Sequence, residues 1–352
     1  MFQIPPVPDL NNPDLAAALA DKIARKTVPH GALGRLAALA QRLGAILGTT
    51  EPRLHAPQLV VFAADHGIVA RGVSAYPSDV TWQMVGNFLA GGAAVSVLAR
   101  QHGIAQTVVD CGVRHDFAPA PGLLIRKVAA GTQDASAGPA MTAAQCDQAL
   151  ANGVALVQGL PGNALLLGEM GIGNTSAATL LTARLGGVDV AEVTGAGTGL
   201  DTQGVARKTA VLREALAANA EATAPLAALA ALGGLEIATM VGAILQAASE
   251  RRVIVVDGFI ASAAVLVASR LAPPVLQRCV FAHQSDERGH ARLLAMLGAG
   301  APAQQGIGPL LDMGLRVGEG SGAALAWPLL VSACAILNEM ASFESAGVSD
   351  RA

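Results

Sequence analysis

The sequence predicts an α/β protein: a mostly parallel, Rossmann-like sheet with helices on both faces, plus a small helical domain built from the two chain ends. Short apolar runs without polar alternation, typical of strands buried on both faces, recur along the 352 residues. Segments of helical composition separate these runs, and each run ends in polar or glycine-rich residues. We therefore assign residues 51–322 to a large α/β domain and residues 1–50 with 323–352 to the small helical domain.

The chain begins with two predicted helices. Residues 15–25 follow the candidate caps Asn12 and Asp14, and residues 33–47 repeat apolar positions at helical spacing. Between them, Pro29 and Gly31 favour a turn.

Predicted strands and helices then alternate. The expected strands cover residues 59–63, 105–110, 123–128, 163–167, 252–257 and 279–282, with a weaker strand or turn at 188–193. The expected helices cover residues 80–100, 177–185 and 203–221, and further helices begin near 142, 259 and 287. Parallel strands end at one edge of a sheet, and ligands bind beyond that edge. Acidic and histidine side chains close to strand ends therefore predict a shared cleft: Asp65, Asp110, Glu169, Asp257 and His283.

Composition excludes several classes of protein. A net charge of −3 and a pI near 6.2 provide no basic surface for nucleic acid. Four cysteines lie far apart in the chain and fit neither a zinc site nor a disulfide framework. The N-terminus lacks the basic start and apolar core of a signal peptide, so we expect a cytoplasmic protein.

The mean hydropathy of +0.48 raises the question of a membrane protein. Residues 225–249 are interrupted by Gly233, Gly234 and Glu236, and residues 322–337 are short and contain Pro328. Both segments are rich in alanine. We interpret them as helices buried in a core or a subunit interface, and expect no membrane association.

The most informative stretch is the glycine-rich loop at residues 168–176, between a predicted strand and a predicted helix. Gly171 and Gly173 permit a sharp turn and close approach to a ligand, and Asn174 and Thr175 are good cap residues. The N–H groups of the following helix attract an anion such as phosphate, and Glu169 stands at the mouth of the loop. A glycine-rich turn with an ordinary N-cap explains the loop alone equally well. Neither a complete dinucleotide fingerprint nor a Walker A motif occurs.

Two further glycine-rich stretches carry charged residues. Glu319 lies between two glycines ahead of an apolar segment, so its side chain has little cover from its neighbours and can face a cavity. For this residue alone, a solvated turn is the simpler explanation. The stretch at residues 195–199 precedes a predicted helix that carries Lys208, one of only four lysines.

The chain resembles the nicotinate-nucleotide:dimethylbenzimidazole phosphoribosyltransferase family over roughly residues 30–330. The resemblance lies in many motifs in family order, at residues 33–36, 64–68, 75–77, 83–84, 87–92, 109–113, 139–142, 168–175, 197–199, 257–258 and 318–320. It implies an enzyme that moves the phosphoribosyl group of nicotinate mononucleotide onto a benzimidazole nitrogen, in the assembly of the lower ligand of cobalamin. It also implies a homodimer.

The resemblance implies site residues as well. The catalytic base of the family falls on Glu319, and its second carboxylate falls on Glu169. Nucleotide phosphate contacts are expected in the glycine-rich loops and at a loop lysine: Gly171, Gly173, Asn174, Thr175, Gly197, Thr198, Gly199 and Lys208. The benzimidazole pocket is expected to include Gln83, Met84 and Val317.

The implied chemistry needs few groups. The pyridinium of the nucleotide departs without protonation, so a single carboxylate base for the incoming heterocycle suffices. A second carboxylate beside the sugar stabilises positive charge at the anomeric carbon. No pyrophosphate leaves, so we expect neither a magnesium site nor a cofactor.

Two other functions stay open at this point. A phosphoribosyltransferase with a purine or phenolic acceptor has the same needs, and the residues named for the pocket do not exclude it. A nucleotide- or corrinoid-precursor-binding protein without turnover is disfavoured, because binding an anion gains nothing from two acidic groups.

Overall fold

The computed structural model describes residues 2–197, 199–300 and 308–349. Its centre is one six-stranded, all-parallel sheet in the order β3-β2-β1-β4-β5-β6. The strands are β1 (Gln58–Ala64), β2 (Ala105–Gly112), β3 (Leu123–Ile125), β4 (Ala164–Met170), β5 (Val253–Val256) and β6 (Cys279–Phe281). Every residue of β1 and β4 is buried, which explains their continuous apolar sequence. The predicted parallel α/β fold is confirmed.

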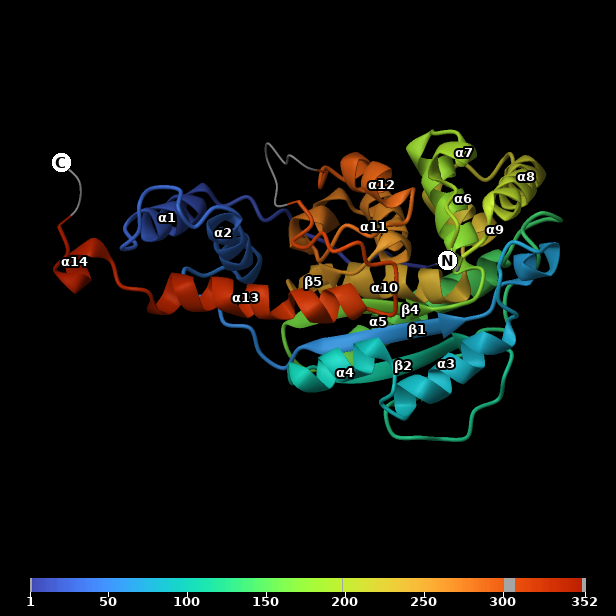
Figure 1. Cartoon of the computed structure of the whole chain (residues 1–352), viewed down its shortest axis with the longest axis horizontal. Coiled ribbons are helices and arrows are strands. Elements are labelled where there is room, and N and C mark those ends of the chain that lie inside the picture. Colours follow the sequence, from blue (N-terminus) through green and yellow to red (C-terminus); the bar gives the residue numbers. More distant parts are fainter. Residues whose placement is uncertain (1, 198, 301–307, 350–352) are drawn as a thin grey trace.

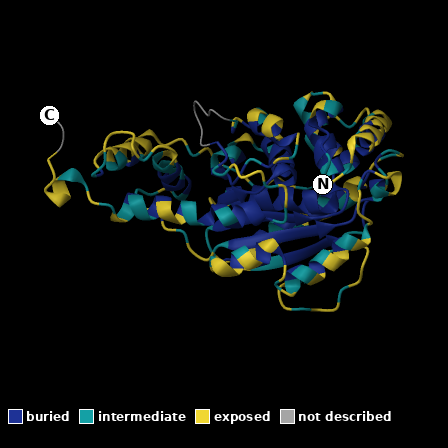
Figure 2. Cartoon of the chain, viewed as in Figure 1, coloured by how far each residue is buried: buried dark blue, intermediate teal, exposed yellow. Residues whose placement is uncertain are grey.

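Two hydrophobic cores cover the two faces of the sheet. Val60 and Phe62 of β1 face one core, and Leu59 and Val61 face the other, as the alternation along a strand requires. The first core contains α5 (Ala143–Gly159), α6 (Asn174–Gly186), α9 (Pro225–Leu232), α10 (Leu235–Ser249), α11 (Phe259–Leu271) and α12 (His290–Met296). The second contains α2 (Arg35–Leu47), α3 (Asp79–Leu89), α4 (Ala94–Gln101) and α13 (Ser321–Glu339). Figure 2 shows the strands and α10 as the most completely buried layer.

The strand order fixes where a ligand binds. The chain builds outward from β1 to β3, then returns to the other side of β1 to build β4, β5 and β6. The direction of construction therefore reverses between β1 and β4, and such a reversal leaves a crevice beyond the carboxyl ends of the strands. The glycine-rich loop of residues 171–173 follows β4 at this point.

Some elements differ from the sequence expectation. The single helix expected at residues 80–100 is two helices, α3 and α4, because Gly91 and Gly92 break it. Residues 188–193 contain the short helix α7 (Val190–Val193), capped by Asp189, and no strand. The helix expected from Glu287 begins at His290. The helix that carries Lys208 is α8 (Thr202–Ala218), with Asp201 as its N-cap.

The helices nearest the two chain ends lie together at one end of the molecule, where α1 (Pro13–Ala24), α2, α14 (Phe343–Ala346) and the far half of α13 extend beyond the sheet (Figure 1). The N-terminus itself lies elsewhere, because Phe2 and Val7 pack against the first core. Backbone bonds join the segments at this end of the molecule: the Thr27 N–H donates to the Ala341 carbonyl, and the Phe343 N–H donates to the Arg25 carbonyl. α13 begins beside the sheet and continues into this group as one helix. The division into two domains at residues 50 and 323 stays a prediction.

Two segments are long and apolar enough to cross a membrane by length and composition: residues 79–101 and α13. More than half of the most apolar window of α13, 56%, is buried inside the protein. Residues 79–101 contain the break between α3 and α4. α10, part of the apolar stretch at residues 225–249, has every residue from Leu235 to Ala248 buried in the first core.

Candidate active site

A cavity opens beyond the carboxyl ends of β4, β5 and β6, with an empty volume of about 680 Å³ that reaches solvent. Its walls come from five parts of the chain. They are the end of β4 with the loop and first turn of α6, the loop after residue 193, the start of α11, the loop after β6, and the turn before α13. The lining residues are Glu169, Met170, Gly171, Ile172, Asn174, Thr175, Gly197, Gly258, Phe259, Ile260, His283, Ser285, Glu287, Arg316, Val317, Gly318 and Glu319.

Most of the residues expected at the site lie in or against this cavity. Glu169, Glu319, Gly171, Asn174, Thr175, Gly197 and Val317 line it. Lys208 does not line the cavity, but its ammonium donates a hydrogen bond to the Thr175 hydroxyl, 3.0 Å away. Gly173 is the N-cap of α6 and has a φ of +94°, so its role is to turn the chain into the helix. Thr198 lies outside the described residues.

The residues expected for base binding are divided. Val317 lines the cavity and is 49% exposed. Gln83 and Met84 lie on α3, whose residues belong to the second core, and they are not among the lining residues. Gln83 is exposed, and Met84 is partly buried against that core. Gly199 also lies outside the lining, and base binding by Gln83 and Met84 stays a prediction.

Glu169 is the penultimate residue of β4 and is only 6% exposed. The side-chain amide of Asn174 donates to its Oε2, and the backbone N–H of Glu319 donates to its Oε1 over 3.4 Å. Burial, followed by the charges of Asp257 and Glu236, raises the pKa of Glu169 to about 8. Glu169 is therefore largely protonated at pH 7 when the cavity is empty.

Glu319 lies in the turn between Gly318 and Gly320, directly before α13. Its φ of +66° is in the left-handed region, which costs a residue with a side chain about 1–2 kcal/mol. A strained backbone at a residue that lines a cavity is a feature of functional sites. Burial, followed by the charge of Asp257, raises the pKa of Glu319 to about 7. At neutral pH this carboxyl group is close to half protonated, as suits a residue that takes up and releases a proton.

Glycines allow the Glu169 carboxylate to meet the backbone of Glu319, although the two residues are 150 positions apart. A Cβ atom on Gly318 would lie 2.5 Å from Oε1 of Glu169. A Cβ atom on Gly168 would lie well inside contact distance of the Glu319 carbonyl oxygen. The turn before α13 therefore packs with its backbone directly against the backbone of β4.

Gly168→Ala is expected to displace this turn, because the added methyl group meets backbone atoms that have no room to move aside. We expect a loss of about 1–3 kcal/mol in the free energy of unfolding, typical of overpacking, measured by urea denaturation. Gly159→Ala is the matched control, since a Cβ atom there meets nothing within 4 Å. Equal stability of the two variants would contradict the close contact.

One wall of the cavity favours an anion. It contains Asn174 and Thr175 from the first turn of α6, the positive end of the helix dipole, and Lys208 reaches the same threonine from α8. A Cβ atom on Gly197 would lie 3.3 Å from the Lys208 ammonium, so this loop closes over the lysine. Lys208 is 1% exposed, and burial lowers its pKa to about 8, while the nearby Glu287 acts against that shift. A phosphate group would provide the buried ammonium with a full counter-charge.

Several residues at the site were assigned no role from the sequence. Asp257 and His283 were expected at this sheet edge because each follows a strand, but nothing in the sequence indicates what they contact. The structure places Oδ1 of Asp257 3.6 Å from Nε2 of His283. Burial disfavours the protonated imidazole, but the hydrogen bond and charge of Asp257 outweigh it and raise the pKa of His283. Arg316 joins two of the glycine-rich loops by donating to the Gly197 carbonyl oxygen, 3.3 Å away.

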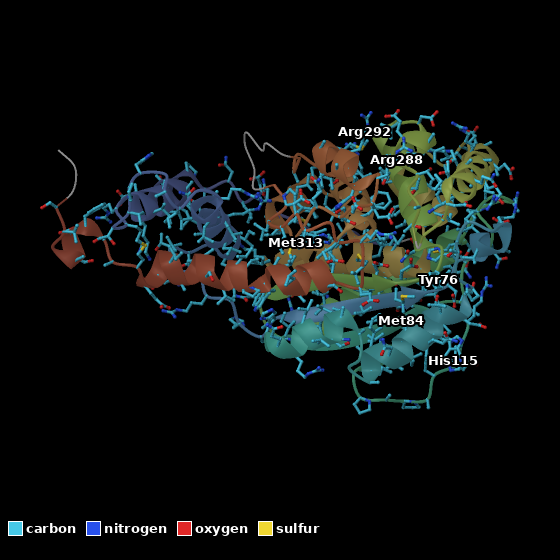
Figure 3. The ribbon with its side chains drawn as sticks, in the orientation of Figure 1. Tyr76, Met84, His115, Arg288, Arg292 and Met313 are labelled. Carbon is cyan, nitrogen blue, oxygen red and sulfur yellow. The ribbon has the colours of Figure 1, made fainter. Side chains whose placement is uncertain are left out.

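Figure 3 labels, among others, three exposed side chains that are not among the lining residues: Arg288 before α12, Arg292 on α12, and Met313 on the loop before α13. Arg292 pairs with Glu192 of α7 at 3.2 Å, which joins α12 to the helix that precedes the loop of Gly197. Met313 is 61% exposed on the loop that leads to Glu319.

Within the described ranges, no group of three or more histidine, cysteine or acidic side chains is arranged to hold a metal ion. The four cysteines are buried and unpaired. The chemistry that the described site offers is therefore that of two carboxyl groups with raised pKa values that line one cavity with the first turn of α6, against which a buried lysine lies.

Known proteins resemble this chain over nearly its whole length. A phosphoribosyltransferase family model matches residues 9–348. The nicotinate-nucleotide–dimethylbenzimidazole phosphoribosyltransferase of Variovorax paradoxus is 67% identical over 346 residues, which cover 98% of this chain and 97% of that protein. The enzyme of the same name from Cupriavidus necator is 56% identical, with coverages of 99% and 98%. The crystal structure of CobT from Thermus thermophilus superposes with a TM-score of 0.90 at 42% identity, covering 96% of this chain and 100% of that one.

Proposed function

Because the chain belongs to the nicotinate-nucleotide–dimethylbenzimidazole phosphoribosyltransferase family, we propose that the cavity beyond β4, β5 and β6 performs this transfer. The enzyme moves the 5-phosphoribosyl group of nicotinate mononucleotide onto 5,6-dimethylbenzimidazole and releases nicotinate and α-ribazole 5′-phosphate, a step in cobalamin assembly. The observation that carries the site assignment is the contact of the Glu169 and Glu319 segments beside the anion site of Lys208 and Thr175.

The anion site holds the 5′-phosphate of the nucleotide. The positive end of the α6 dipole and the ammonium of Lys208, which donates to Thr175, both lie at the wall of the cavity that Thr175 lines. The phosphate takes no part in bond breaking, so this site anchors the sugar without needing to change during the reaction. The sugar then extends from the anion site toward the two carboxyl groups.

Glu169 acts at the sugar carbon. Nicotinate in the nucleotide is a positively charged pyridinium, which leaves with the electron pair of its bond to the sugar and needs no acid. Positive charge develops at the sugar carbon as that bond breaks. A neighbouring cation lowers the pKa of a carboxyl group, so Glu169, held neutral in the empty cavity, becomes the counter-charge when the cationic nucleotide is bound.

Glu319 is the base. One nitrogen of dimethylbenzimidazole bonds to the sugar carbon, and the other nitrogen must then lose its proton, which the Glu319 carboxylate accepts. Attack on the face opposite nicotinate inverts the sugar carbon from β to α. A pKa of about 7 suits this role, because the carboxylate is substantially available at neutral pH and still basic enough to take the proton.

The activity should depend on pH through Glu319. Only its ionised form accepts a proton, and its pKa is raised to about 7, so kcat/KM should fall below pH 7 by at least tenfold per pH unit. The fall should be steeper than for one group, because Glu169, with a pKa of about 8, must ionise as well. The profile is measured from pH 5.5 to 9 with several benzimidazoles, because their ring nitrogens also titrate. If the acid limb of kcat/KM stays near pH 7 for every benzimidazole, the group that titrates is part of the protein. An acid limb that shifts with the pKa of the benzimidazole substrate would contradict the assignment to Glu319.

The acceptor is tested directly by product analysis. The protein is incubated with nicotinate mononucleotide and a panel of benzimidazole, purine and phenolic bases, without added metal, and the products are identified by mass. We expect release of nicotinate and formation of α-ribazole 5′-phosphate with dimethylbenzimidazole. Preferred transfer to a purine or a phenol would show that dimethylbenzimidazole is not the acceptor. Nucleotide binding without any product would contradict the proposal that the protein is an enzyme.

We propose that the enzyme works as a cytoplasmic homodimer without membrane association. Exposed apolar side chains on the group formed by the chain ends, Val331 and Val348, support contact with a second copy. The burial of α10 and of more than half of α13's apolar window supports a water-soluble protein. Detergent-free purification followed by sedimentation equilibrium tests both points. A monomer, or a protein that requires detergent, would contradict them.

A further inference from the structure

We propose that Asp257 is a positioning residue for the transfer: its buried carboxylate binds the turn that carries Glu319 and holds Glu319 toward the cavity. Asp257 follows β5 directly and is 1% exposed. Its Oδ2 accepts the N–H of Gly320 at 3.2 Å, and its Oδ1 accepts the N–H of Ala323 at 2.9 Å. The proposal rests on the role of Glu319 as the base.

The turn needs such a partner because α13 has no side-chain cap of its own. Its N-cap residue is Gly320, and the buried hydroxyl of Ser321 has no hydrogen-bond partner. The first N–H groups of a helix require acceptors, and a carboxylate at this end also complements the helix dipole. Asp257 supplies that acceptor from the end of β5. The first turn of α13 is therefore bonded to the sheet and not only to residues near it in the sequence.

The backbone at Glu319 also needs an external restraint. Gly318, Glu319 and Gly320 have φ values of +74°, +66° and +92°, three consecutive residues in the left-handed region. Glycine tolerates this region, but glutamate avoids it and relaxes unless its surroundings hold it. Asp257 binds the residue directly after Glu319, so it restrains this conformation at the nearest point.

The first turn of α13 is packed closely against two side chains. A Cβ atom on Gly322 would lie 2.9 Å from Oδ1 of Asp257 and 2.5 Å from Nε2 of His283. The first turn of α13 therefore rests directly on the Asp257 and His283 side chains. A shift of the Asp257 carboxylate has to move the turn, and with it the carboxyl group of Glu319.

The charge of Asp257 acts on the same reaction, in addition to its hydrogen bonds. It contributes to the raised pKa of both Glu319 and Glu169. The other titratable groups that face this cluster are Glu236, which is near Glu169 and bonded to His66 at 2.7 Å, His283 beside Asp257, and Asp312, whose charge acts on His283. Replacing Asp257 by a neutral residue should therefore make Glu319 a stronger acid as well as a less well oriented base.

The test compares Asp257→Asn with Asp286→Asn, which removes the same charge from an exposed position. We expect Asp257→Asn to lower kcat about 10- to 100-fold, as misplacement of a catalytic group does, with the KM for nicotinate mononucleotide within about threefold of wild type. The acid limb of kcat/KM should move on the order of one unit to lower pH, because a negative neighbour of Glu319 has been removed. Asp286→Asn should change neither quantity.

Three outcomes would overturn the proposal. If Asp257→Asn keeps a kcat within about threefold of wild type and the acid limb of kcat/KM does not move, Asp257 has no part in the reaction. A lowered kcat with an unmoved limb and a KM for the nucleotide that rises by more than about tenfold assigns it to the general stability of the site, as does failure of both Asp257→Asn and the smaller Asp257→Ser to fold. These results are distinct from failure of the proposed function, since that failure would appear as full activity of Glu319→Gln.

Discussion

Glu319→Gln is expected to lower kcat by about 10²–10⁴-fold, the range for loss of a general base, while the affinity for nicotinate mononucleotide stays near that of wild type. Glutamine has nearly the same size and can occupy the same space beside Glu169, but it does not accept the proton of the benzimidazole. The phosphate of the nucleotide is held by Thr175 and Lys208, so its binding does not depend on this carboxylate.

Steady-state kinetics and calorimetric titration with the nucleotide separate the two effects. Glu344→Gln is the matched control, because Glu344 is exposed on α14 at the far end of the chain. The acid limb near pH 7 should also vanish from the residual activity of Glu319→Gln. Full activity in this variant would remove Glu319 from the mechanism.

Lys208→Ala is expected to raise the KM for nicotinate mononucleotide about 10- to 100-fold with a smaller change in kcat. A hydrogen bond to a charged group contributes about 1.5–3 kcal/mol, and the phosphate is bound equally in the ground state and the transition state, so its loss appears in KM. Lys208→Met, which keeps most of the side-chain volume, should give the same result and excludes a packing effect.

The neighbouring Arg207→Ala provides the control, because Arg207 is exposed on the same helix. In the wild-type protein, nucleotide binding should also weaken above about pH 8, where Lys208 loses its proton. An unchanged KM in both Lys208 variants would contradict the phosphate assignment.

The parts of the site that could be predicted from the sequence are those whose signal is local. Glu169 and Glu319 each lie among glycines, and Lys208 lies shortly after a third glycine-rich stretch. The contact between the first two segments depends on how α13 packs on β4, which no local pattern encodes. Apolar runs predicted the strands well because burial on both faces leaves a continuous signature in the sequence.

The role of Asp257 could not be predicted for a related reason. An aspartate after a strand indicates the sheet edge, but its partners, Gly320 and Ala323, belong to a helix that starts more than 60 residues later. The break between α3 and α4 was missed because apolar spacing continues on both sides of Gly91 and Gly92. Gln83 and Met84 were assigned from resemblance alone, and the cavity of this structure is lined without them.

α13 links two distant parts of the molecule. It starts one residue after Gly320 and ends beside the N-terminal helices, 19 residues later, which is about 28 Å at 1.5 Å per residue. Pro328 lies inside this helix and lacks a backbone N–H, so the helix can bend there. A tilt of the outer end is therefore absorbed in part at Pro328 before it reaches the turn that carries the proton acceptor.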